Sequence, residues 1–518
     1  MKSAIITSLI VFTGVISIMN VNAAVDKCEN VTTPDIALVQ DAFTHGYTHN
    51  EVTDIVGGKS YPTLTIQCVN GGKHEPHDDN SKGFSSVWTR DLYWGNLGWA
   101  QAGDDKAVVR MRTSIEALID CKNRNKAEGQ SKTWPLNDGR YYIPQAYTSG
   151  GVIAETFFPY CSESQVDFLL FVQLYWRMSG DNQFVEKIWN DVAYVTETVE
   201  LLDTNGNGLP DNMWGSYDYQ YVGQDMEEPL MSAKASAAYN AVAEMAGALG
   251  KNDEAKRLQL LANKVKRTMN LPISDGGLWK PMSEGGYYIN KRIITKGKES
   301  IDEDFIPYEN ICPLFYGMAS KAQAEAILNK LDANFNDIYP LKYGPMYTAH
   351  AALTNESATD KATTPWLGFL DVYVRCKLGH SKNRSAIFSL LIQHAYDVPA
   401  APFTEGIGIG GLLTSNAGRS WDNGNFFHCL VSGIYGIEKS DKGITVTAPV
   451  KLADFPLTEL KNVCWRDAIY DFKWQGEGFR ISEVTVDGKP RHITSSGTFM
   501  LTVKSGKHLV VVKMGDSK

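Results

Sequence analysis

The chain has 518 residues, a formal net charge of −9 at pH 7 and no long run of basic residues. This charge balance argues against nucleic acid and against anionic membrane surfaces as partners. Trp, Tyr and Phe make up 11% of the residues, a fraction that is consistent with contact to carbohydrate.

The first 23 residues have the pattern of a secretory signal peptide. Lys2 precedes a largely apolar run from Ile5 to Ile18, and Val-Asn-Ala ends at Ala23 with small residues at the −1 and −3 positions of a cleavage site. The run is too short and too interrupted to favour a spanning helix, and a retained membrane anchor is the alternative. We therefore expect an exported protein, periplasmic or secreted, with no membrane contact after cleavage.

Eight cysteines are scattered along the chain, and no Cys-x-x-Cys or Cys/His cluster indicates a zinc site. In an oxidising compartment some of them can form disulfides, but their spacing does not predict the pairs.

Residues 24–84 show no sustained periodicity, so we expect an irregular N-terminal segment. Beyond them, from about Asp104 to Ile437, apolar residues recur at helical spacing in successive pairs of segments. The joints between partners resemble one another, because Gly ends the first helix and Asn or Asp caps the next. These joints are Met178–Asn182, Leu249–Asn252 and Leu378–Asn383. Hairpins of this kind stack and bury a shared core, which predicts a closed ring over residues 85–437, with an open solenoid as the alternative.

After Ile437 the pattern changes to alternation with period two, as in "FRISEVTVDG" and "HLVVVKM". Asp-Gly and Ser-Gly turns separate several of these runs. The pattern predicts a small antiparallel β domain over residues 438–518, which carries no recognisable binding motif.

Three loop stretches concentrate polar and aromatic side chains, and the first is "SSVWTRDLYWGNLGW", residues 85–99. It places Arg90 and Asp91 beside Trp88 and Trp94. Charged groups among large rings suit a ligand that is polar and flat-faced, such as a sugar. For each Trp, packing in the core is an equally good interpretation.

The second stretch is "DTNGNGLPDNMWGSYDYQYVG", residues 203–223. Its start at Asp203 matches a calcium loop, but Trp214 stands where an EF-hand carries its final Glu. A structural Ca²⁺ near Asp203 is one interpretation and a tight turn is the other; no further metal or cofactor is expected. Asp211 and Asp218 lie beside aromatic residues, whose surroundings can raise a carboxyl pKa as a general acid requires.

The third stretch, residues 399–428, is rich in Gly and carries Glu405 in uncharged surroundings. Trp421, Asp422 and His428 follow it. Glycines allow the backbone to approach a ligand closely, although a lone Glu in such a loop is more often a turn or cap residue.

These stretches, a ring of hairpins and a terminal β domain together resemble the six-hairpin glycosidases, which share an (α/α)6 barrel. "TRDLYWGNLGWAQAGD" is similar to the "RDERLGWTGD" type of stretch in inverting α-L-rhamnosidases, and Thr404 and Glu405 resemble their C-terminal region. Residues 203–223 look like the "DGDGLxEN…TYDxW" segment of β-glucosidase/glucosylceramidase-type enzymes, whose catalytic Glu falls on Asp211. Asp91 stands where the α-L-rhamnosidases carry Glu. Asp211 stands where the β-glucosidase/glucosylceramidase-type enzymes carry Glu.

The resemblance implies an exported, inverting glycoside hydrolase, α-L-rhamnosidase-like or a related exo-glycosidase, that acts on a glycoside, an oligosaccharide or a polysaccharide. Glu405 would be the base and Asp218 the acid, with Asp91 as the close rival and Asp211 behind it. Arg90 and Asp91 would hold sugar hydroxyls. The remaining substrate-binding candidates are Trp88, Trp94, Trp214, Trp421, Asp422 and His428.

Two other functions remain open from the sequence. One is a polysaccharide lyase on a helical toroid, in which Arg140, Tyr141, Tyr142 and His428 would supply the base and neutralise a uronic acid. The other is a glycan-binding protein without catalytic activity.

Overall fold

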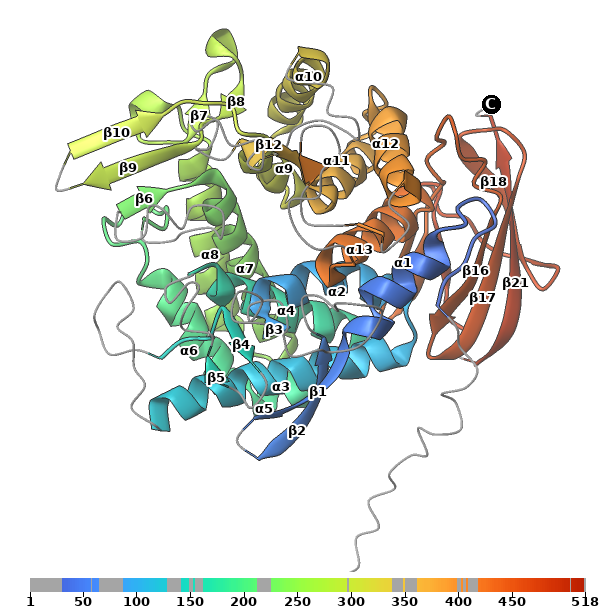
Figure 1. Cartoon of the computed structure of the whole chain (residues 1–518), viewed down its shortest axis with the longest axis horizontal. Coiled ribbons are helices and arrows are strands. Elements are labelled where there is room, and N and C mark those ends of the chain that lie inside the picture. Colours follow the sequence, from blue (N-terminus) through green and yellow to red (C-terminus); the bar gives the residue numbers. More distant parts are fainter. Residues whose placement is uncertain are drawn as a thin grey trace, which may run out of the picture.

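The computed structural model describes most of the chain, and the elements below lie within that part (Figure 1). The described residues are 30–56, 58–64, 87–127, 141–148, 152–153, 162–211, 225–295, 298–337, 348–349, 361–397, 402–403, 407–408, 418–503 and 505–516. Glu405, Asp218, Trp214 and Arg140 lie outside them, as do residues 1–23.

Six inner helices form a closed ring. Each one packs against the next in chain order, and the last packs against the first, so that α13 lies beside α2 although the two are far apart in sequence (Figure 1). The inner helices are α2 (Thr89–Ala102), α4 (Glu163–Ser179), α7 (Pro229–Ala248), α9 (Pro307–Phe315), α11 (Pro365–Leu378) and α13 (Ser420–Phe427). The ring is the predicted (α/α)6 barrel, and the open solenoid is excluded.

Glycine makes the closure of the ring tight. A Cβ on Gly98 of α2 would lie 1.7 Å from the carbonyl oxygen of Gly424 in α13, and one on Gly424 would lie 2.3 Å from the oxygen of Gly95. The two backbones can approach this closely only because neither has a side chain there.

Outer helices cover the ring and differ from the inner ones in burial. Every residue of α2 is buried, whereas the buried residues of α8 are Leu258, Ala262, Val265 and Met269, a single stripe at helical spacing. The outer helices are α1 (Val39–Gly46), α3 (Asp105–Ala127), α5 (Asn182–Lys187), α6 (Trp189–Glu200), α8 (Asn252–Met269), α10 (Lys321–Asp337) and α12 (Arg384–Asp397).

The joint between α4 and α5 has the predicted chemistry, whereas α8 begins after Lys251 without a side-chain cap. Gly180 ends α4 with a φ of 70°, in the left-handed region, and Asp181 then accepts a hydrogen bond of 2.9 Å from the backbone N–H of Phe184. The N-terminal segment, in contrast, was predicted to be irregular but carries α1 and the hairpin of β1 (Glu51–Val56) with β2 (Lys59–Leu64). Elements this short leave little periodic signal in the sequence.

Small sheets lie at the end of the ring where the inner helices begin. The strands β3, β6 and β12 run directly into α2, α7 and α11 and so fix where these helices start. In sheet order the groups are β3 (Val87–Trp88), β4 (Ala146–Thr148), β5 (Val152–Ile153); β10 (Lys298–Asp302), β9 (Lys291–Thr295), β6 (Asp225–Glu227); and β11 (Thr348–Ala349), β12 (Lys361–Thr363), β13 (Ile407–Gly408). A further hairpin joins β7 (Trp279–Lys280) to β8 (Tyr287–Tyr288).

Strands follow the ring, as the alternating pattern predicts. A π-helical segment, η8 (His428–Ile434), leads from α13 into β14. One sheet has the order β14 (Ile437–Ser440), β15 (Gly443–Val446), β20 (Phe499–Leu501), and the other has β16 (Glu459–Trp465), β17 (Asp467–Gln475), β21 (Ser505–Gly515), β18 (Arg480–Val486), β19 (Lys489–Pro490).

The sheets are antiparallel with one exception, in which β17 and β21 pair in parallel from Asp467 with Ser505 to Gln475 with Lys513. The last strand enters between β17 and β18, so it is antiparallel to β18 and parallel to β17. Alternation predicts which face of a strand is buried but not the direction of its neighbour. The predicted antiparallel β domain is confirmed, and this parallel pair is the exception among its described strands.

The described cysteines fall into two groups. Cys464 is disulfide-bonded. Free thiols are found at Cys121, Cys312, Cys376 and Cys429. None of the helices in the described ranges is long and apolar enough to cross a membrane.

Candidate functional site

The first turns of the inner helices bring charged side chains together at one end of the ring. Arg90 and Asp91 lie in the first turn of α2, and Arg419 directly precedes α13. A carboxylate oxygen of Asp91 lies 3.7 Å from Nε of Arg90, and its other oxygen lies 4.0 Å from Nη2 of Arg419. All three side chains are buried, so the stretch that sequence analysis singled out does hold charges away from water.

Asp91 differs from the carboxylates at the same position of two other inner helices. The third residue is Asp91 in α2, Glu309 in α9 and Asp422 in α13. Glu309 accepts a 2.6 Å hydrogen bond from the backbone N–H of Leu230 in α7, and Asp422 accepts one of 3.1 Å from Trp366 in α11. Each thereby caps the preceding inner helix.

Neither carboxylate oxygen of Asp91 accepts a hydrogen bond from another described residue, although Asp91 is only 4% exposed. Burial raises the pKa of this carboxyl, and the positive charges of Arg90 and Arg419 oppose that rise. A buried carboxylate without hydrogen bonds is costly, so Asp91 is well suited to accept hydrogen bonds from a ligand.

Aromatic rings form a wall beside these charges. Trp366 and Trp421 stack with centroids 4.9 Å apart, and the guanidinium of Arg90 lies 4.3 Å from the centroid of Trp421. Trp94 packs against Trp366 at 5.2 Å. Trp94 and Trp421 are fully buried in this wall, and Trp88 is 8% exposed at the end of β3. The structure therefore brings Trp94 and Trp421 to the charges, where both pack against Trp366.

A second charged group lies deeper in the ring and was missed by sequence analysis. Lys234 of α7 is fully buried between two carboxylates of α4, with Nζ 2.5 Å from Glu163 and 2.7 Å from Asp167. The ammonium also lies 5.3 Å from the centroid of the Trp94 ring. Burial raises the pKa of Asp167 to about 7, against the opposing charge of Lys234. A single Lys among the apolar residues of an inner helix is the sequence signal that would have found it.

Asp211, the third candidate for the acid, is engaged by its own loop. Its carboxylate accepts hydrogen bonds from the backbone N–H of Thr204 at 3.1 Å, from the Thr204 hydroxyl at 2.8 Å and from the backbone N–H of Asn205 at 3.0 Å. Burial raises the pKa of Asp211 and these hydrogen bonds oppose the rise. This geometry favours a role in holding the turn.

The side chains of the calcium-like loop are also bonded within the protein. The Asp203 carboxylate accepts from the backbone N–H of Gly208 at 3.0 Å, and Asn205 and Asn207 both donate to Glu227. No group of three or more His, Cys, Asp or Glu is arranged to hold a metal within the described ranges. Oδ1 of Asp203 is buried without a hydrogen-bond partner among the described residues, and calcium near Asp203 stays a prediction.

His428 lies among aromatic rings, with its ring centroid 4.3 Å from that of Tyr373 and 6.0 Å from that of Phe315. Burial lowers its pKa to about 3, with a small contribution from Lys377, so the ring is neutral at ordinary pH. Neither ring nitrogen has a hydrogen-bond partner in the described part of the chain. These surroundings do not suit the base of a lyase.

Comparison with known proteins bears on the fold. No protein-family model matches the chain, and no curated protein does. Among solved structures, the GH78 family rhamnosidase of Bacillus sp. GL1 is 13% identical with a TM-score of 0.54, over 94% of this chain and 44% of that chain. A protein described as a sialidase is 14% identical with a TM-score of 0.59, over 89% and 40% of the two chains. An uncharacterised conserved protein from Thermus thermophilus is 10% identical with a TM-score of 0.50, over 76% and 99%.

The chain thus spans less than half the length of the first two proteins that it resembles. At these identities the likeness concerns the fold alone. The fold is the predicted one, an (α/α)6 barrel followed by strands.

Proposed function

We propose that this chain, with the barrel of the six-hairpin glycosidases as its scaffold, is an exported glycoside hydrolase that acts with inversion. The observation that carries the proposal is Asp91, a buried carboxylate with no hydrogen bond from another described residue, between two arginines at the start of the inner helices. A sugar hydroxyl donates to such an oxygen and restores the hydrogen bonds that burial removed.

The chemistry requires two carboxyl groups on opposite faces of the scissile bond. We assign the base to Glu405, which activates water, and the acid to Asp218, which protonates the leaving oxygen. Inversion leaves about 6.5–9.5 Å between the two groups to admit that water. Asp91 is the rival for the acid, supported by its raised pKa, and Asp211 ranks below it because its oxygens are occupied by the 203–211 loop.

The substrate is a glycoside, oligosaccharide or polysaccharide, and the α-L-rhamnosidase-like stretch around Arg90 favours an exo-acting enzyme. Arg90 is held by its contact with Trp421, which orients the guanidinium toward hydroxyls on the same side as Asp91. Asp422 orients the start of α11 through the N–H of Trp366. Trp88, Trp214 and His428 complete the proposed contacts.

The test is release of reducing sugar by purified protein from plant and bacterial glycans and from aryl α-L-rhamnoside and aryl β-glucoside. The ultraviolet absorbance of a new carbon–carbon double bond is followed in parallel. Sugar release without new absorbance supports the hydrolase, and NMR of the first-formed anomer decides between inversion and retention. New absorbance on a uronic-acid polymer would replace the proposal by a lyase.

The residue assignments need variants on a substrate found in this way. Glu405→Gln and Asp218→Asn are each expected to lower kcat by about 10²–10⁴-fold with unchanged thermal stability. Near-normal activity of Glu405→Gln would remove the base assignment, and near-normal activity of Asp218→Asn would move the acid to Asp91.

Export is the remaining part of the proposal. The disulfide at Cys464 supports it, because disulfides persist in oxidising compartments. Cell fractionation of the full chain is expected to recover a processed protein outside the cytoplasm, and a full-length cytoplasmic product would contradict export.

A further inference from the structure

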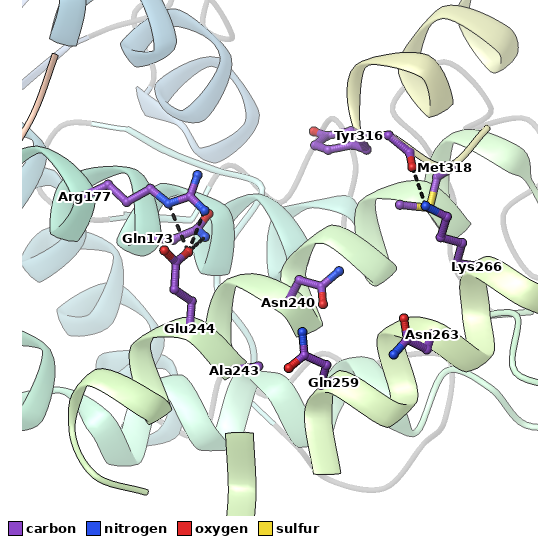
Figure 2. Close-up of a pocket in the computed structure, with 11 residues that line it drawn as sticks. Gln173, Arg177, Asn240, Ala243, Glu244, Gln259, Asn263, Lys266, Tyr316 and Met318 are labelled. Carbon is purple, nitrogen blue, oxygen red and sulfur yellow. Dashed lines mark hydrogen bonds and ion pairs between the residues drawn. The ribbon is translucent and has the colours of Figure 1, made fainter. Parts of the chain in front are cut away.

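A pocket of about 580 Å³ lies at the far ends of three inner helices, away from the charged cluster at their starts (Figure 2). Asn240 on its floor is 11 residues along α7 from Pro229, which corresponds to about 16 Å of helix. Gln173 and Arg177 belong to the last turns of α4, and Tyr316 directly follows α9. The pocket is therefore separate from the candidate active site.

Two helices, α7 and α8, present rows of polar side chains to this pocket. Asn240 and Glu244 are four residues apart on α7, Gln259 and Asn263 are four apart on α8, and Lys266 follows three residues later. Residues at these spacings share one face of a helix. The volume falls within the roughly 300–1,000 Å³ that small-molecule sites occupy.

The amides of the pocket keep their hydrogen-bonding capacity. Asn240, Gln259 and Asn263 make no side-chain hydrogen bond in the part of the chain that the structure describes. In Figure 2 they lie between the pair of Arg177 with Glu244 on one side and Lys266 on the other. Each primary amide offers two donors and an acceptor, the combination that matches hydroxyl groups.

The charges that line the pocket are already engaged. Arg177 contacts the Glu244 carboxylate through Nη2 at 2.6 Å and Nε at 3.0 Å, and Gln173 donates to the same oxygen at 2.6 Å. Nζ of Lys266 donates to the carbonyl oxygen of Gly317 at 2.7 Å. An anion would have to compete for these cations, and a metal ion would find the single carboxylate of Glu244 bonded to Arg177.

We propose that this pocket binds a neutral sugar or polyol unit, as a second carbohydrate site on the far side of the barrel. The free amides of α7 and α8 would bind its hydroxyls, and the ring of Tyr316 would lie at one end of the site. The inference does not depend on hydrolysis, since a binding protein without catalytic activity would use the pocket in the same way.

The test is isothermal titration of the full protein with maltose and cellobiose as neutral probes, and with glucuronate and inorganic phosphate as anionic ones. The double variant Gln259→Ala/Asn263→Ala is expected to weaken the neutral disaccharide about tenfold or more, because it removes two hydrogen-bonding groups. Asn252→Ala is the matched control, an exposed amide on α8 outside the pocket. Both changed side chains are exposed, so folding is expected to be preserved and is checked by thermal unfolding.

Three results would overturn the proposal. One is the absence of saturable binding by either neutral disaccharide. Another is binding of glucuronate or phosphate in place of the disaccharides. The third is disaccharide binding that Asp91→Asn weakens and the double variant leaves unchanged, which would assign it to the candidate active site.

Discussion

The starts of α2 and α4 lie next to each other in the ring, and both bury carboxylates, but they balance them differently. Glu163 and Asp167 of α4 share the ammonium of Lys234 at 2.5 and 2.7 Å. Asp91 of α2 has its arginines at 3.7 and 4.0 Å and no hydrogen bond from another described residue. In the first arrangement both carboxylates contact a cation of the protein directly, whereas in the second the oxygens of Asp91 stay open to a hydrogen-bond donor from a ligand.

The largest effect on stability is expected where buried carboxylates contact their cation directly. Lys234→Met would leave Glu163 and Asp167 buried without their cation, which costs about 3–5 kcal/mol of folding free energy. Denaturant unfolding measures this loss. Lys266→Met is the control, an exposed lysine that donates to a backbone carbonyl and is expected to change stability by less than about 1 kcal/mol. Equal stability of the two variants would show that the group of α4 and α7 is not a structural unit.

Asp91→Asn is the contrasting change and is expected to affect function more than stability. Loss of charge-assisted hydrogen bonds worth about 1.5–3 kcal/mol would lower kcat/KM about 10- to 150-fold on the substrate that the hydrolysis screen identifies. The free energy of unfolding is expected to change little, because removing the buried charge lowers its desolvation cost but also removes its attraction to Arg90 and Arg419.

The control for Asp91→Asn is Glu309→Gln, at the same position of α9, where the carboxylate caps α7. That variant is expected to lose stability and keep activity. If Asp91→Asn unfolds more easily and stays active, the carboxylate serves the fold and the comparison fails.

Asp211→Asn tests the other carboxylate from the sequence motifs and should have a smaller effect. Its oxygens accept hydrogen bonds from two backbone N–H groups and one hydroxyl. In Asn an NH₂ group replaces one of these oxygens, so a donor would face the donors of the loop. We expect a loss of about 2 kcal/mol by thermal or denaturant unfolding, with kcat/KM nearly unchanged. Asp225→Asn, an exposed carboxylate at the start of β6, is the control. A large loss of activity without destabilisation would return Asp211 to the list of catalytic candidates.

The sequence predicted the ring well because its signals are local. The joint at Gly180 and Asp181 has the predicted cap, and apolar spacing predicts helices without knowledge of their neighbours. The direction of β21 beside β17 was not predictable, since it depends on which strands the chain has already paired.

The candidate site was predictable in part. Arg90 and Asp91 stand out from the sequence because charges rarely occur among so many rings, and the structure does bury them. Sequence could not show that Trp366 would cover Trp421, or that Lys234 would lie between two carboxylates of α4, because both contacts join segments far apart in the chain. Glu405 and Asp218 stay predictions that rest on resemblance.

The smallest effect is expected for a carboxylate that is matched at the surface. Asp487 lies 2.8 Å from Nδ1 of His508, and its hydrogen bond with that ring is the first cause that lowers its pKa below 3.8. A depressed pKa contributes stability that is present above the unfolded pKa and is lost as the pH falls below about 4. The Asp487 side chain is 47% exposed, so solvent screening reduces the contribution to less than about 1 kcal/mol.

Asp487→Asn therefore tests whether solvent exposure explains why this carboxylate contributes less to the free energy of unfolding than the buried carboxylates of the ring. Asp487 has a φ of 52°, which Asn also tolerates, so the turn is preserved. We expect the difference in unfolding free energy from the parent to stay below about 1 kcal/mol at pH 7 and to shrink toward zero near pH 3. A difference as large as that of Lys234→Met would mean that a matched pair contributes equally at the surface and in the ring, and burial would no longer explain the large effect expected at Lys234.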